Sequence, residues 1–98
     1  MIKLFRAVST AELFDLINSG KFQAASNSLE GKFFAVTLED AEQWGRWFYG
    51  DTTFHIVSAE LPRKDIEKLL VWPHLDGVGP AVYAELSDLE SAIISIVI

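Results

Sequence analysis

Arg6 is the residue in this sequence whose type and position most call for a chemical explanation. It lies in IKLFRAV, a stretch that is otherwise apolar except for Lys3. A cation in a mostly apolar strand needs an explanation, and a functional role is one. The structural alternative places Arg6 at a strand edge with its head group in solvent.

Two carboxylates and two serines are further candidates. Glu60 and Glu85 lie near the ends of expected strands, where cleft residues occur, although either can equally be a surface charge. Ser26 and Ser28 lie in the polar, turn-rich stretch 21–30, and loops of this kind often carry ligand contacts. A solvated connector is the other interpretation of that loop.

Familiar catalytic and metal-binding patterns are absent from the sequence. It contains no GxSxG, Walker, GxGxxG or HExxH motif, and neither His55 nor His74 has a carboxylate or second histidine at ligand spacing. The absence of cysteine excludes a disulfide framework and a thiolate metal site. We therefore expect no bound metal, and histidines that are simply packed or solvated.

Length and charge narrow the function classes. The 98 residues predict one domain over residues 1–98, and a net charge of -6 argues against nucleic-acid binding. Residues 1–35 nevertheless carry four basic residues, Lys32 among them, against three acidic ones. An anionic small ligand would therefore favour this first third. No apolar stretch predicts a signal peptide or a membrane span, so we expect a cytoplasmic protein without membrane contact.

The stretch from Gly31 to Tyr49 organises the expected fold. Its apolar run 33–36 predicts a buried strand, and Thr37 followed by Asp40 predicts the start of a helix. The buried face of that helix should contain Ala41, Trp44, Gly45 and Phe48.

Other elements follow from capping and periodicity. Ser9 and Glu12 predict a helix start and Gly20 its end, with a buried stripe of Leu13, Leu16 and Ile17. We also expect strands over 2–8, 53–61, 82–86 and 92–98, the last one buried, a short helix from Pro62 to Leu70, and an irregular loop over WPHLDGVGP. The order of these elements predicts a mixed α+β or α/β domain with three helices, and it favours a split or mixed sheet over a regular doubly wound one.

The order LFRAVS, GKFFA and GPAVYAEL resembles the ADP-ribosyltransferase fold, especially poly(ADP-ribose) polymerases and small bacterial toxin domains. The resemblance spans nearly the whole chain. It implies an α+β fold with a split, mostly antiparallel sheet and three helices, and NAD as cofactor. It implies that Arg6 holds the ribose or diphosphate and that Phe33, in place of the family's Tyr, stacks on nicotinamide. It adds Ser28 and Lys32 as possible contacts. Arg6 and Phe33 should then share one cleft, and their placement on opposite sides of the sheet would end the argument from resemblance.

The sequence departs from that family at its catalytic carboxylate. The family's Glu, which precedes a strand of the type Glu-Tyr-Ile-Val-Tyr, falls on Gly79. Transfer of ADP-ribose should therefore be slow unless Glu60 or Glu85 substitutes. We expect Glu85 to lie far from the cleft, because it is six residues beyond Gly79.

Three tryptophans favour a second function class, a non-catalytic protein-interaction module on the same fold. Trp44, Trp47 and Trp72 cannot all be fully buried in so small a core. An exposed Trp beside Phe48 or Tyr49 would mark a surface for a protein partner.

Overall fold

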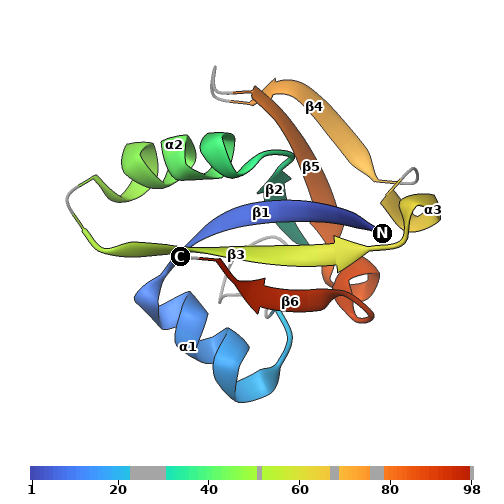
Figure 1. Cartoon of the computed structure of the whole chain (residues 1–98), viewed down its shortest axis with the longest axis horizontal. Coiled ribbons are helices and arrows are strands. Elements are labelled where there is room, and N and C mark those ends of the chain that lie inside the picture. The colour runs from blue at the N-terminus through green and yellow to red at the C-terminus, as the bar shows by residue number, and fades with distance from the viewer. Residues whose placement is uncertain (23–30, 51, 67–68, 76–78, 98) are drawn as a thin grey trace.

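The computed structural model describes residues 1–22, 31–50, 52–66, 69–75 and 79–97. Their elements, in chain order, are β1 (Ile2–Ser9), α1 (Thr10–Ser19), β2 (Gly31–Ala35), α2 (Leu38–Tyr49), β3 (Phe54–Leu61), α3 (Arg63–Ile66), β4 (Leu70–Leu75), β5 (Gly79–Glu85), the 3-10 helix η1 (Leu86–Leu89) and β6 (Ile93–Ile96). The chain is a small α+β domain, as predicted (Figure 1).

The described strands form a six-stranded sheet in the order β4-β5-β2-β1-β3-β6, and every neighbouring pair is antiparallel. β1 pairs with β3 over its whole length, from Ile2 opposite Leu61 to Ser9 opposite Phe54. β1 and β2, in contrast, share a single register pair, Phe5 opposite Ala35. The sheet therefore opens between β1 and β2 beyond that point, and we refer to this place as the β1–β2 opening.

Local sequence signals fix the ends of the two longer helices. The Ser9 hydroxyl accepts a hydrogen bond from the Glu12 backbone N–H, and Gly20 ends α1 in the left-handed conformation with φ 73°. The Thr37 hydroxyl accepts from the Asp40 N–H at the start of α2. These caps are confirmed as predicted.

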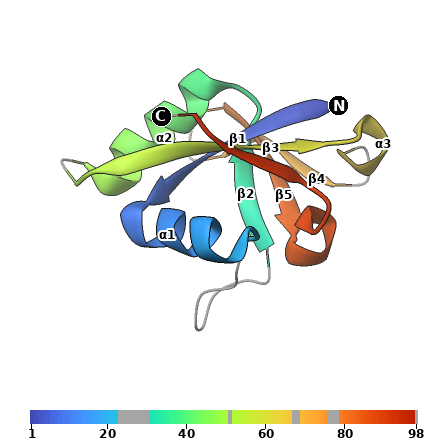
Figure 2. The same cartoon turned by 60° about the horizontal axis from the view of Figure 1, so that its bottom comes forward.

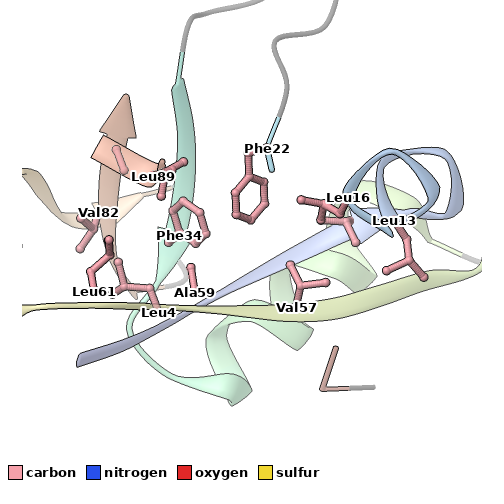
Figure 3. Close-up of a cluster of buried hydrophobic side chains, with 12 residues drawn as sticks. Leu4, Leu13, Leu16, Phe22, Phe34, Val57, Ala59, Leu61, Val82 and Leu89 are labelled. Carbon is pink, nitrogen blue, oxygen red and sulfur yellow. The ribbon is translucent and has the colours of Figure 1, made fainter. Parts of the chain in front are cut away.

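The two longer helices, α1 and α2, lie on opposite faces of the sheet (Figures 1 and 2). A cluster of hydrophobic side chains lies beneath each of them. The first cluster joins Leu13 and Leu16 of α1 to Phe22 and to Phe34 of β2. Figure 3 shows the Phe22 and Phe34 rings beside each other within this cluster. The second, beneath α2, contains Ala35, Ala41, Trp44, Ile56 and Ala81. We call these faces the α1 face and the α2 face.

The predicted helix stripes were each one residue too wide. Ile17 is 57% exposed and Phe48 is 62% exposed, whereas the remaining members of both stripes are buried. Each helix is covered by the sheet along a narrow strip, so the residue at the margin of the pattern stays in solvent.

Three predicted elements in the second half of the chain were also wrong. α3 ends at Ile66 rather than Leu70, and the predicted irregular loop is partly strand, because Leu70–Leu75 pairs with β5. Pro73 is compatible with a strand here because β4 lies at the edge of the sheet. The closing strand is not buried, since β6 forms the other edge and Ile93 and Ile96 are more than half exposed.

Candidate functional site

Arg6 lies at the β1–β2 opening and is held by three hydrogen bonds. Its Nε and Nη2 donate to the two carboxylate oxygens of Glu12 in α1 at 2.8 and 3.1 Å, and its Nη1 donates to the Phe33 carbonyl oxygen at 3.1 Å. Both charged side chains are 21% exposed. The guanidinium therefore joins β1, α1 and β2 where the two strands separate, a partly buried position and not the solvated strand edge of the structural alternative.

Lys32 lies on the same face as Arg6 and is buried, with 9% of its surface exposed. Burial lowers the pKa of the Lys32 ammonium; the charges of Glu12 and Asp15 oppose this shift, and that of Arg6 adds to it. Two cationic and two anionic side chains thus share the α1 side of the β1–β2 opening. A buried lysine with a depressed pKa is a common feature of functional sites.

Phe33 does not share a cleft with the Arg6 side chain, so that prediction is wrong. Leu4 and Val8, on either side of Arg6, belong to the cluster on the α1 face, and side chains alternate along a strand. Phe33 packs on the α2 face, where its ring lies 5.0 Å from that of Tyr83. The described contact between the two residues is the hydrogen bond from Arg6 to the Phe33 backbone carbonyl. The two side chains lie on opposite sides of the sheet, and this placement ends the argument from resemblance to the ADP-ribosyltransferase fold.

The two candidate carboxylates lie apart from each other. Glu60 forms an ion pair with Lys3 at 3.4 Å near the start of β1. Glu85 stands opposite Gly31, so it lies at the end of β2 where the β1–β2 opening is found. The expectation that Glu85 would lie at the far end was wrong, because β5 runs antiparallel to β2 and carries Gly79 to the other end. Ala84, the neighbour of Glu85, belongs to the cluster on the α1 face, so the Glu85 side chain lies on the α2 face, opposite to Arg6 and Lys32.

Gly79 has no room for an undisturbed side chain. A Cβ built at this position would lie 2.5 Å from Oδ2 of Asp40, near the start of α2. A carboxylate therefore already occupies the space beside the residue that aligns with the family's glutamate. The sequence marked Asp40 only as a capping partner, so its proximity to Gly79 was missed.

The remaining candidates add little to this site. His55 approaches the Thr10 hydroxyl at 3.4 Å, while Ser26, Ser28 and the side chains of His74 and Trp72 lie outside the described residues. Among described residues, no group of three His, Asp or Glu could hold a metal ion. A hollow of about 220 Å³ near η1 is lined by Asp65, Ser87, Asp88 and Ser91, none of which was predicted.

Sequence reasoning also missed one member of the site. Glu12 was recognised as a capping residue only, although it is the carboxylate that binds Arg6. Tyr49, at the end of α2, stacks on Phe54 of the α2 face, and burial raises the pKa of its hydroxyl. A basic residue on a strand followed by an acidic residue in the first turn of the next helix is the signal that would have found the Arg6–Glu12 pair.

Replacing Lys32 with Met is expected to stabilise the fold at neutral pH, because the folded state disfavours the charged ammonium. The pKa of Lys32 in the folded state is lower than the ordinary value of 10.5 in the unfolded chain. Between these two pKa values the unfolded chain binds more protons than the folded chain. The unfolding free energy of the wild type therefore rises with pH in this range. The advantage of Lys32→Met over wild type should therefore be largest at neutral pH and shrink above the folded pKa. Urea unfolding at a series of pH values measures this difference.

Lys21→Met is the matched control, since Lys21 is exposed. Its stability relative to wild type should not change with pH over the same range. If the difference in unfolding free energy between wild type and Lys32→Met stays constant up to pH 10, the assignment of a depressed pKa to Lys32 is contradicted.

Comparisons with known proteins leave the site to be interpreted on its geometry. No family model, no curated protein and no solved structure matches this chain. Within the described residues, no helix has the length and apolar character needed to cross a membrane.

Proposed function

We propose that this chain binds a nucleotide with a diphosphate, such as NAD, at the β1–β2 opening. The observation that supports the proposal is the pair of cationic side chains, Arg6 and Lys32, at a place where three stretches of the sequence meet. The stretch LFRAVS lies within β1, the stretch GKFFA is β2, and the stretch GPAVYAEL contains β5. These three strands are neighbours in the sheet, in the order β5-β2-β1. Stretches far apart in the sequence are thus gathered at one part of the sheet.

The cationic groups of the proposed site are Arg6 and Lys32. A guanidinium has five N–H groups, and the described contacts of Arg6 use three of them, so two are left for a phosphate oxygen. Glu12 and Asp15 oppose the approach of an anion. Binding should therefore be weak. Phe33 is not part of this proposal, because its ring lies on the other face.

Catalysis in this proposal is close to background. A carboxylate that stabilises the developing positive charge on ribose must lie beside it in a fixed orientation. Glu60 is engaged by Lys3, and Glu85 is exposed at the end of β5. Loss of an oriented electrostatic stabiliser typically lowers turnover by roughly 100- to 1000-fold. Purified protein should therefore release nicotinamide from NAD barely faster than buffer.

Calorimetric titration with NAD, ADP-ribose and ATP at millimolar concentration tests the binding proposal. Wild type should bind at least one of them weakly, and Lys32→Met should lose measurable binding because the second cation is gone. Since that variant is expected to be more stable than wild type, its loss of binding would not reflect unfolding. Lys3→Met, which removes a half-exposed cation at the far end of β1, is the control and should bind as wild type does.

The absence of heat with all three nucleotides would reject the proposal. Brisk release of nicotinamide that Glu60→Gln or Glu85→Gln abolishes would instead reject the view of weak catalysis, and would assign the chemistry to that carboxylate.

A non-catalytic protein-interaction module is the second candidate, favoured by an exposed aromatic pair. Trp47 and Phe48 on α2 are 65% and 62% exposed, and their rings contact edge to face with centroids 4.8 Å apart. Exposed tryptophans are enriched at the centres of protein interfaces. The partner would present an apolar pocket to this pair. An NAD titration without heat, together with a protein partner whose binding Trp47→Ala weakens, would favour this candidate over the first.

A further inference from the structure

β6 forms an edge of the sheet that is apolar and carries no charge. Ile93 and Ile96 are 54% and 56% exposed, and Val97 is 38% exposed. The segment 91–97 contains no charged residue. Natural sheets usually protect such an edge with lysine, proline, a bulge or a covering element.

The pairing of β6 with β3 fixes which backbone groups face outward. Val97 N–H donates to the Ile56 carbonyl at 2.8 Å, so the pair of residues 56 and 97 is hydrogen bonded. Hydrogen-bonded pairs alternate along an antiparallel ladder. Ser95 opposite Ser58 therefore also points its backbone groups toward β3, whereas the N–H and C=O groups of Ile94 and Ile96 point away from the sheet.

The opposite edge of the sheet is unsuited to the same pairing. β4 contains Pro73, which has no N–H to donate, and its pairing with β5 shifts register between Trp72 and Leu75. Contact between β6 of one molecule and β4 of another would also leave further edges free and generate open chains of molecules. A β6 edge that meets a second β6 edge avoids both problems.

We propose that two copies of this chain associate through β6, antiparallel and about a two-fold axis at Ser95. In this register Ile94 of one copy lies opposite Ile96 of the other, and the outward backbone groups of both residues form four hydrogen bonds across the axis. The side chains of Ile94 and Ile96 then meet on the α1 face, and no charge is buried. The interface uses the same surface of both copies and closes as a dimer.

Ser95→Cys tests the register directly, because the natural sequence has no cysteine. In the proposed dimer the two Ser95 residues face each other as a non-hydrogen-bonded pair with Cα atoms about 4.5 Å apart, within the range for a disulfide. Mild oxidation should cross-link this variant at least about tenfold faster than Ser91→Cys, since only the facing thiols are held together. Ser91 is likewise exposed, but it is displaced from the axis.

Hydrogen exchange and sedimentation of the unmodified chain complete the test. Wild type should show concentration-dependent dimers, and the Ile94 and Ile96 amides should gain protection with concentration. The Ser95 and Val97 amides, which already bond to β3, should not change. A chain that stays monomeric, or equal cross-linking of the two cysteine variants, would overturn the proposal. Nucleotide binding at the β1–β2 opening is measured separately and does not depend on this outcome.

Discussion

Trp44→Ala is expected to cost about 3 to 5 kcal/mol of unfolding free energy, the usual cost of removing a large aromatic side chain from a core. Trp44 is 5% exposed and is the largest side chain of the cluster on the α2 face. Three of the four other buried residues of that cluster are alanines, so the indole fills most of the space between α2 and the sheet.

Trp47→Ala is the matched control on the same helix. Trp47 is 65% exposed, so its replacement should change stability by less than about 1 kcal/mol. Urea unfolding followed by far-ultraviolet circular dichroism compares the two variants without relying on tryptophan fluorescence. Equal losses for Trp44→Ala and Trp47→Ala would show that the orientation of α2 is wrong.

Arg6→Ala is expected to destabilise the fold by about 2 to 4 kcal/mol. The change leaves the Glu12 carboxylate without its cation and the Phe33 carbonyl without the Arg6 donor, and breaking a buried ion pair from one side costs roughly 3 to 5 kcal/mol. The lower value here reflects the one-fifth exposure of both side chains. Arg6→Lys should recover only part of the loss, because an ammonium lacks the paired geometry.

A double-mutant cycle separates the ion pair from simple loss of packing. Arg6→Ala with Glu12→Gln should be less damaging than the sum of the single changes, since the second change removes the uncompensated charge. Lys3→Ala is the comparison at the exposed Lys3–Glu60 pair and should cost well under 1 kcal/mol. Additive effects of the Arg6 and Glu12 changes would contradict a structural role for the pair. This role also means that Arg6→Ala cannot by itself report on nucleotide binding.

The features predicted most accurately from the sequence are the helix ends, which depend on a few neighbouring residues. Ser9, Gly20 and Thr37 each determine a helix end through contacts within one turn, and all three were identified correctly. Ile17 and Phe48 were misplaced because a helical period gives the direction of a buried stripe but not its width, which the shape of the opposing sheet decides. β4 was missed because its pairing partner, β5, determines it more than its own composition does.

The site required long-range information that no local pattern contains. Arg6 was recognised from its unusual position, but its partner Glu12 was assigned a different role. Phe33 was placed with Arg6 by resemblance, whereas the alternation of side chains and the β1–β2 opening decide on which face each lies. Glu85 was placed at the wrong end because strand direction cannot be read from one strand alone.

The single register pair between β1 and β2 divides the sheet into two ribbons. One ribbon is the antiparallel set β1, β3 and β6, and the other is β2, β4 and β5. Backbone pairing is extensive within each ribbon, whereas β1 and β2 share a single register pair. Contacts between side chains therefore provide most of the interaction between the two ribbons. We therefore expect the two ribbons to separate from each other more readily than either one unfolds, with the packing of Phe34 near Leu4 and the hydrogen bond from Arg6 to the Phe33 carbonyl opposing that separation.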